Sequence, residues 1–182
     1  MDKSKIIYHG QQQRYYLYNM LSQFCNEVFI SCNTEQAEFI STDYKFIVDE
    51  KAYADVGPAV ALLSAVSHFP ERNWIVIGCD YPFISTKILE DFISTLKEKT
   101  IAAAFYNPPK KVYEPLLGYY SAGIIPQMIN ILEGEDYSLQ HFLKIVNANK
   151  HVTDKEEIKN INTPDEMRAA KIILKSREND SK

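Results

Sequence analysis

Asp80 has the most suggestive chemical setting of any side chain in this sequence. It follows a short apolar and β-branched run, residues 74–77, which is too brief for a helix and predicts a strand buried on both faces. Pro82 cannot donate to a sheet ladder and biases Tyr81 away from the helical region, so the backbone must leave the sheet just after the carboxylate. Asp80 is thus predicted at the carboxyl end of a buried strand, a position suited to a metal ion or to phosphate chemistry. The alternative is that Asp80 only caps the turn that follows.

The segments on either side of this strand predict alternating strands and helices. Strands are expected at residues 5–8, 27–32, 45–48, 101–105 and 114–120, and amphipathic or buried helices at 13–24, 59–69, 86–97, 124–132 and 139–146. Strands that alternate with helices are typical of the α/β class.

Helix-start signals show where several of these helices begin. Ser85 is expected to cap the helix after Asp80, and Pro58 follows Gly57 at the first turn of a helix whose free N–H groups could bind an anion. Thr163 and Glu166 have the spacing of a capping box, which predicts a closing helix over residues 164–174. Before it, residues 158–162 predict a strand on which Asn160 and Asn162 share one face.

Bulk properties limit the class of protein. The chain has 182 residues, 46% of them hydrophobic, which predicts one domain over residues 1–176 with a frayed tail at 177–182. The net charge is −4 and the 20 basic residues are spread along the chain, so no nucleic-acid partner is expected. No apolar run approaches the roughly 20 residues of a membrane span and no signal core is seen, which predicts a cytoplasmic protein with no membrane partner. Cys25, Cys32 and Cys79 lack C-x-x-C spacing, so we expect reduced packing residues rather than disulfides or zinc ligands.

Two other features admit both a functional and a structural interpretation. The tyrosines of residues 13–24 could form a stacking surface, although aromatic residues at helical spacing more often pack against a sheet. Lys110 and Lys111 could contact a phosphate, although a solvated loop is the simpler interpretation of adjacent lysines beside prolines.

Three segments in a fixed order give the sequence a family resemblance. They are Asp49 leading to Gly57-Pro58, then Cys79-Asp80-Tyr81-Pro82, then Asn160-Ile161-Asn162-Thr163-Pro164. Together they resemble the molybdenum cofactor guanylyltransferases, which are MobA-like nucleotidyltransferases, and residues 113–116 resemble a further segment of that family. The resemblance implies a Rossmann-like, doubly wound and mostly parallel sheet with helices on both faces.

The resemblance also implies roles for individual residues. Asp80 would bind Mg²⁺ on the nucleotide triphosphate, with Lys3 on the phosphates, and Asn160 and Asn162 would contact the pterin. The positions implied for nucleotide binding are Lys3, Ser31, Asn33, Asp49, Gly57 and Asp80. Ser31 stands where the family has asparagine, and the segment after Gly57 lacks the family's second glycine.

The N-terminal part of the sequence departs most from the family. Relatives begin with a buried strand and a glycine-rich phosphate loop, whereas Lys3 here matches the very end of that loop. We therefore expect a missing central strand between residues 28–32 and 75–79. We also expect weak triphosphate binding and no catalysis by the 182 residues alone, with an upstream segment or a partner domain supplying the loop.

The function implied is Mg²⁺-dependent transfer of GMP from GTP to molybdopterin, in molybdenum cofactor biosynthesis. Two alternatives remain open: the same chemistry on a sugar phosphate or another small acceptor, and a degenerate binding module or half of a larger protein without catalysis. The sequence does not fix the base of the nucleotide.

Overall fold

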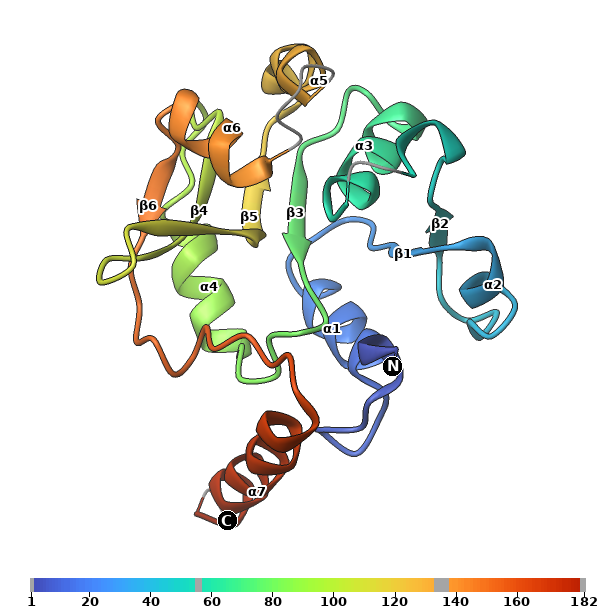
Figure 1. Ribbon diagram of the computed structural model, residues 1–182, viewed down its shortest axis with the longest axis vertical. Helices are drawn as coiled ribbons and strands as arrows, with labels where there is room; N and C mark the ends of the chain where they lie inside the picture. The colour runs from blue at the N-terminus through green and yellow to red at the C-terminus, as the bar shows by residue number, and fades with distance from the viewer. Residues whose placement is uncertain (1, 55–56, 133–137, 181–182) are drawn as a thin grey trace.

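The computed structural model describes residues 2–54, 57–132 and 138–180. Its main sheet has the strand order β3 (Trp74–Ile77), β5 (Val112–Tyr120), β4 (Ala102–Asn107), β6 (Asn149–His151). β5 runs antiparallel to both of its neighbours, and β4 and β6 are parallel (Figure 1). The expected class, α/β, is confirmed.

The expectation of a mostly parallel sheet is wrong, because the main sheet is mixed. β4 and β5 are joined by a tight turn in which Lys111 has a φ of 54°. A connection this short can join only antiparallel strands, since parallel neighbours need a long crossover. β1 (Ile30–Cys32) and β2 (Phe46–Val48) are parallel but form a separate two-stranded sheet.

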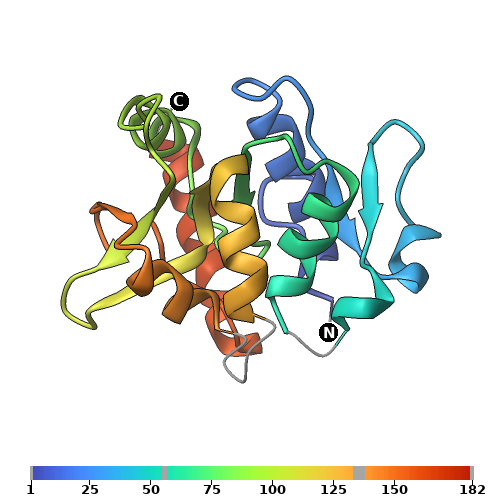
Figure 2. The ribbon, with the colours of Figure 1, turned by 90° about the horizontal axis from the view of Figure 1, so that it is seen from above.

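Helices cover both faces of the strands, as expected. On one face, α3 (Ala59–His68), α5 (Ile125–Leu132) and α6 (Leu139–Ile145) pack on a core that includes Tyr120 and Phe142. On the other, α1 (Gln13–Leu21) and α4 (Thr86–Ser94) pack on a core that includes Phe92 and Phe105 (Figure 2). The alanines of β4 serve both cores, because successive side chains of a strand point to opposite faces: Ala102 and Ala104 face the first core and Ala103 the second.

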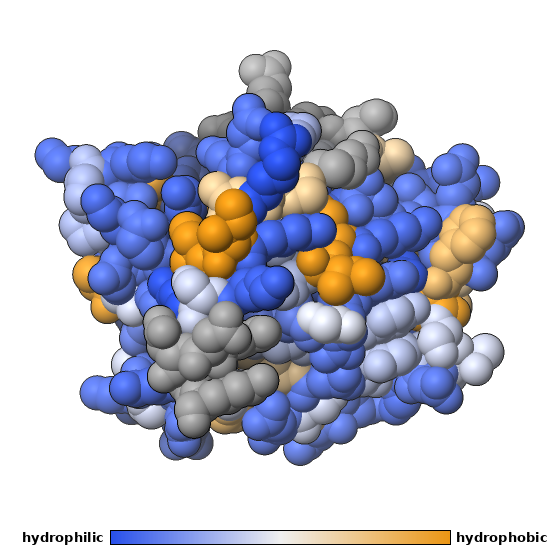
Figure 3. All heavy atoms as spheres, turned by 90° about the horizontal axis from the view of Figure 1, so that it is seen from below, coloured by the Kyte–Doolittle hydropathy of each residue, from blue (hydrophilic) through white to orange (hydrophobic). Residues whose placement is uncertain are grey.

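The closing helix α7 (Pro164–Asp180) lies at the end of the molecule toward which β3 runs (Figure 1). It packs through a small cluster that contains Phe83, Ile161 and Leu174. The helix continues through residues 177–180, for which we predicted a frayed tail. Seen from this end, the surface is mostly hydrophilic with separate hydrophobic groups (Figure 3).

Several expected boundaries are also corrected. Residues 5–8 do not form a strand: Lys3–Lys5 is a 3-10 helix, η1, and Ile7 makes only an isolated bridge with Gln12. Residues 158–162 are irregular rather than a strand. Short elements that we did not predict are α2 (Thr34–Ala37), η2 (Lys51–Tyr53), η3 (Ala122–Ile124) and β6. No helix among residues 2–54, 57–132 and 138–180 is long and apolar enough to cross a membrane.

Candidate active site

Asp80 lies just beyond the end of β3, as its sequence context predicted. The last ladder bond runs from the Gly78 N–H to the Leu116 carbonyl at 2.7 Å, and the chain then turns out of the sheet. A Cβ atom on Gly78 would lie 2.5 Å from Asp80 Oδ1 and 3.3 Å from Leu116 Cβ. Glycine at position 78 therefore leaves the space that the Asp80 carboxylate occupies.

The loop before α7 holds Asp80 through two hydrogen bonds. Asn160 Nδ2 donates to Asp80 Oδ2 at 2.6 Å, and the Ile161 N–H donates to the Asp80 carbonyl at 2.8 Å. Asn160 Oδ1 is buried and has no hydrogen-bond partner within residues 2–54, 57–132 and 138–180. Asn160 was expected at the pterin, and in the structure its amide nitrogen is bonded to the Asp80 carboxylate, a contact that was not predicted.

Lys3 completes this group of side chains. Its Nζ donates to Asn162 Oδ1 at 2.6 Å and lies 3.8 Å from Asp80 Oδ2. Asp2 caps η1 by accepting from the Ser4 N–H, which fixes the backbone beside Lys3. Four residues predicted from distant parts of the sequence, Lys3, Asp80, Asn160 and Asn162, thus form one cluster, which we call the Asp80 cluster.

The capping box of α7 fixes the far side of this cluster. The N–H groups of Asn162 and Thr163 both donate to Glu166 Oε2 at 2.9 Å, and the Glu166 N–H donates to Thr163 Oγ1 at 3.2 Å. These bonds confirm the predicted helix start. They also fix the backbone of Asn162, whose side chain receives Lys3.

The donor set of the Asp80 cluster fits Mg²⁺ bound together with a nucleotide. Asp80 Oδ1 accepts no hydrogen bond from the residues that the structure describes, so one carboxylate oxygen remains available. Those residues contain no group of three or more His, Cys, Asp or Glu side chains able to hold a metal ion. Mg²⁺ commonly binds one or two carboxylates together with substrate phosphates and water, so a lone carboxylate is compatible with it.

Glu114 places a second carboxyl group near Asp80, on the hydroxyl of the adjacent Tyr81. We did not predict a function for it. Tyr81 Oη donates to Glu114 Oε2 at 2.9 Å. Burial raises the pKa of the Glu114 carboxyl, and the hydrogen bond from Tyr81 partly offsets this. Burial also raises the pKa of Tyr81, to which the negative charge of Glu114 adds. The sequence signals for Glu114 were its charge inside an otherwise apolar and aromatic strand and the resemblance of residues 113–116 to a segment of the family.

The neighbouring Cys79 carries a neutral thiol at neutral pH. Burial, with a smaller contribution from the charge of Asp80, raises the pKa of Cys79 to about 12. The thiol is therefore neutral and a poor nucleophile. Cys25, Cys32 and Cys79 are all free.

The positions that the resemblance implied for nucleotide binding on the other half of the fold form a separate group. Ser31 Oγ donates to Asp49 Oδ1 at 2.7 Å, which joins the carboxyl ends of β1 and β2. Asn33 caps α2 in a reciprocal capping box with Gln36. Gln36 Nε2 donates to Asp2 Oδ2 at 3.1 Å, so this group is linked to the Asp80 cluster through the residue next to Lys3.

Gly57 and the two lysines lie outside these groups. Gly57 has a φ of +59° before α3, where a side chain would be strained, and no contact joins it to the Asp80 cluster among the described residues. Lys110 and Lys111 are exposed in the turn between β4 and β5. This position agrees with a solvated loop.

The tyrosines of α1 are packing residues. Tyr15 stacks on Tyr44 with ring centroids 4.3 Å apart, and Tyr18 meets the edge of the same ring at 4.9 Å. Tyr16 stacks on His9 at 3.8 Å. The α1 tyrosines thus join the helix to neighbouring segments, as the structural interpretation predicted.

The chain matches the model of a known protein family. Residues 1–152 match the model of the MobA-like NTP transferase domain. The chain belongs to this family. The match includes Lys3, Asp49 and Asp80 and ends before Asn160 and Asn162.

Curated relatives carry names from molybdenum cofactor biosynthesis. A probable molybdenum cofactor guanylyltransferase from Flavobacterium johnsoniae is 30% identical over 149 residues, which cover 78% of this chain and 77% of that protein. A molybdenum cofactor biosynthesis bifunctional protein from Synechocystis is 28% identical over 120 residues. That match covers 66% of this chain but spans only 34% of the relative's length.

Solved structures share the fold. Molybdopterin-guanine dinucleotide biosynthesis protein A from Archaeoglobus fulgidus superposes with a TM-score of 0.73 at 22% identity, covering 97% of this chain and 92% of that one. 2-C-methyl-D-erythritol 4-phosphate cytidylyltransferase from Thermus thermophilus superposes with a TM-score of 0.65 at 9% identity, covering 95% and 93%.

Proposed function

We propose that this chain supplies the metal-binding and acceptor site of an enzyme that transfers GMP from GTP to molybdopterin. The observation that carries the proposal is the Asp80 cluster: a carboxylate at the end of β3, held by Asn160, flanked by Lys3 and retaining one available oxygen. Membership of the MobA-like family and the names of the relatives support GTP and molybdopterin as the substrates.

The reaction is an in-line displacement at phosphorus. A phosphate oxygen of molybdopterin attacks the α-phosphorus of GTP and forms a new P–O bond, while the bond from the α-phosphorus to the bridging oxygen breaks and pyrophosphate leaves. The product is a pterin dinucleotide. Such transfers depend mainly on positioning and on neutralising phosphate charge, so a dedicated general base is not needed.

The charges of Asp80 and Lys3 would have different roles in this reaction. Asp80 would hold Mg²⁺ through Oδ1, and the ion would supply positive charge to the triphosphate oxygens. The Lys3 ammonium has three donors, of which one is given to Asn162, so the others are available to phosphate oxygens. On the other half of the fold, Ser31, Asn33 and Asp49 would contact the nucleotide.

The asparagines of the loop before α7 would act on the acceptor side. The amide nitrogen of Asn160 is already bonded to Asp80, so its contribution is to orient the carboxylate. Asn162 is exposed beside Lys3, and its amide could contact the polar pterin ring while its oxygen orients the lysine.

A product assay tests the proposal. The chain is incubated with GTP, Mg²⁺ and molybdopterin, and the dinucleotide and pyrophosphate are measured for the native sequence, Asp80→Asn and the control Asp91→Asn, which alters an exposed carboxylate of α4. With a glycine-rich phosphate loop joined ahead of the chain, we expect the two products in equal amounts and their loss only in Asp80→Asn, whereas the 182 residues alone should give neither product. Equal turnover by the loop-bearing chain with and without Asp80→Asn would remove Asp80 from the site.

The same assay separates the alternatives. Pyrophosphate release with a sugar phosphate, but not with molybdopterin, would assign the second acceptor class. Nucleotide binding without any turnover, in a chain that is otherwise folded, would support the non-catalytic module.

A further inference from the structure

Glu114 is connected to Asp80 through side chains that the reaction proposed above does not use. Its Oε2 accepts a hydrogen bond from Tyr81 Oη at 2.9 Å, and Tyr81 directly follows Asp80 in the sequence. Tyr81 is 2% exposed, so its hydroxyl is not open to a substrate. Any effect of this hydrogen bond on the reaction must therefore pass through other side chains.

An irregularity in β5 directs the Glu114 side chain toward Tyr81. The ladder with β4 pairs Gly118 and Glu114 with successive residues of β4, so residues 115–117 bulge out of that ladder. Glu114 and Leu117 are three positions apart, and in a regular strand they would point to opposite faces of the sheet. Leu117 nevertheless packs in the same core as Tyr81, and Glu114 bonds to that tyrosine. The bulge therefore re-aims the carboxyl group, as bulges beside active sites often do.

The sequence supports the bulge at Pro115. Proline has no N–H to donate to a ladder, so inside a sheet it is confined to edges and bulges. The Pro115 carbonyl accepts a hydrogen bond from Tyr120 Oη at 2.8 Å, and Tyr120 is fully buried. Glu114 is thus presented by an ordered strand.

The Tyr81 oxygen also meets the amide of Asn160. Burial raises the pKa of Tyr81, and a side-chain hydrogen bond from Asn160 partly offsets this rise. Since the Tyr81 hydrogen goes to Glu114, the tyrosine oxygen acts as an acceptor toward Asn160. The amide nitrogen of Asn160 has two hydrogens, and it also donates to Asp80 Oδ2 at 2.6 Å. The nitrogen therefore lies between two acceptors.

These two acceptors decide which way the Asn160 amide faces. Its Oδ1 is buried without a hydrogen-bond partner in the part of the chain that the structure describes, so the oxygen does not stabilise either orientation. Turned by half a rotation, the amide would place this oxygen against the Asp80 carboxylate and the Tyr81 oxygen, which are both acceptors. The orientation thus depends on Tyr81 remaining an acceptor on this side.

We propose that Glu114 is a positioning residue for the Asp80 carboxylate. By holding the Tyr81 hydrogen, Glu114 leaves the tyrosine oxygen to accept from Asn160. The Asn160 nitrogen then stays on Asp80 Oδ2, so that Oδ1 is the oxygen presented to Mg²⁺. Without Glu114, the Tyr81 hydroxyl would be free to turn its hydrogen toward Asn160 and displace the amide. This role rests on the proposed function, in which Asp80 binds Mg²⁺.

The first test observes the Asn160 amide in the 182-residue chain, without metal or nucleotide. Its side-chain signals are followed by nuclear magnetic resonance in Glu114→Leu, Tyr81→Phe and Glu114→Gln. We expect the first two variants to shift the Asn160 signals and to speed the exchange of its amide hydrogens by about tenfold. Glu114→Gln retains an acceptor oxygen for Tyr81 and should keep the signals close to their native positions.

Two controls make this result specific to the Glu114 contact. Tyr119→Phe removes another hydroxyl beside the same core, and Glu90→Leu removes an exposed carboxylate of α4. Both should leave the Asn160 signals unchanged. Tyr81→Phe keeps the buried ring and loses a single oxygen, so it decides the proposal if Glu114→Leu does not fold.

The second test separates positioning from a general loss of packing. Calorimetric titration measures GTP affinity with and without Mg²⁺. In Glu114→Leu and Tyr81→Phe we expect the strengthening by Mg²⁺ to fall by about fivefold, while the affinity for GTP without Mg²⁺ is unchanged. Glu114→Gln and both controls should retain the native effect of Mg²⁺.

The two measurements distinguish this role from the function on which it rests. Unchanged Asn160 signals in Glu114→Leu and Tyr81→Phe would overturn the proposal. Displaced signals with an undiminished effect of Mg²⁺ would also overturn it, because Asn160 would then not govern Asp80. A native chain that gains no GTP affinity from Mg²⁺ would instead contradict the function proposed for Asp80, and the amide signals would still decide whether Glu114 positions Asn160.

Discussion

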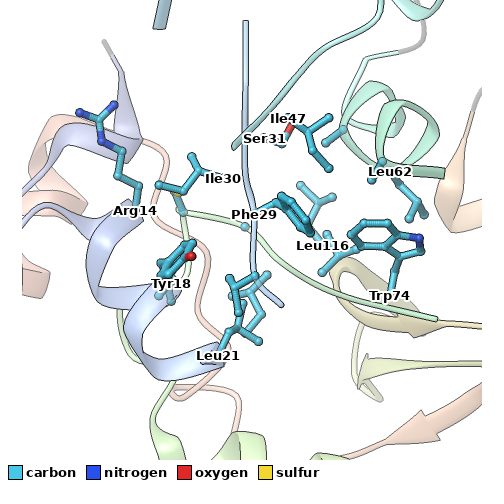
Figure 4. Close-up of a pocket in the computed structure, with 18 of the residues that line it drawn as sticks. Arg14, Tyr18, Leu21, Phe29, Ile30, Ser31, Ile47, Leu62, Trp74 and Leu116 are labelled. Carbon is cyan, nitrogen blue, oxygen red and sulfur yellow. The ribbon is translucent and has the colours of Figure 1, made fainter. Parts of the chain in front are cut away.

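The two edges of β3 differ sharply in how they are completed. One edge pairs with β5 over four residue positions, and at its carboxyl end Asp80 receives two hydrogen bonds from a loop some 80 residues away in sequence. The other edge borders a mostly apolar cavity of about 540 Å³ between β1 and β3, which we call the strand slot (Figure 4), and has no ladder partner among the residues that the structure describes. The comparison shows that the Asp80 cluster is assembled by the paired half of the fold together with Lys3, and does not require contact between β1 and β3.

Core truncations should reveal this asymmetry most strongly. Leu117 of β5 is 1% exposed and fully packed, so Leu117→Ala should lower the free energy of unfolding by about 2–5 kcal/mol. Ile75 of β3 is half-buried and borders the slot, so Ile75→Ala should cost less, about 1–2 kcal/mol. Urea unfolding measures both values, and equal losses would show that the slot side of β3 is as well packed as the other.

A change at Gly78 should affect the site more than the fold. In Gly78→Ala the new Cβ would displace the end of the Asp80 side chain, and we expect GTP affinity in the presence of Mg²⁺ to fall by roughly tenfold, or about 1.4 kcal/mol. Gly123→Ala is the matched control, because its Cβ would meet nothing within 4 Å. Unchanged affinity in Gly78→Ala would mean that the position of Asp80 is not critical for the nucleotide.

Removing the cap of α7 tests the loop that holds Asp80. Thr163→Ala should lower the free energy of unfolding by about 1 kcal/mol, because the Glu166 N–H loses its side-chain acceptor. Thr163→Ser keeps the hydroxyl and should restore most of the loss. Thermal melting of the three proteins gives the comparison, and equal stability of all three would show that the cap is not needed.

The smallest predicted effect is a pH dependence of stability that arises from the Glu114 carboxyl. Burial raises the pKa of Glu114 above its ordinary value of 4.5, so the folded state favours the protonated form. The stabilisation from this group is complete below 4.5 and is lost as pH rises through the folded-state pKa. Glu114→Gln should remove this decline, so the difference in unfolding free energy between variant and native protein should grow in the variant's favour as pH rises. A difference independent of pH would contradict the shift.

Local signals predicted much of the fold. The apolar run of residues 74–77 is β3, and both Ser85 and Thr163 cap the helices that their sequence context indicated. These features depend on a few neighbouring residues, so local sequence was enough to predict them. The direction of β5 was missed because it depends on pairing across the sheet, which the alternation of strands and helices does not specify.

Four of the predicted site residues, Lys3, Asp80, Asn160 and Asn162, lie together in the structure, but the bonds between them were not predicted. The bond from Asn160 to Asp80 joins residues 80 apart through an irregular loop, and the expected strand there gave the wrong geometry. Glu114 was missed as a functional neighbour because its proximity to Asp80 passes through the Tyr81 hydroxyl, a tertiary contact.

Calorimetric titration of GTP, with and without Mg²⁺, most directly tests whether Asp80 is the metal-binding carboxylate of this chain. We predict that Mg²⁺ strengthens GTP binding at least about tenfold in the native chain and in Asp91→Asn, and has no such effect in Asp80→Asn, because the amide retains the shape but lacks the charge that fixes the ion. The same strengthening by Mg²⁺ in Asp80→Asn as in the native chain would contradict the assignment and place the metal elsewhere.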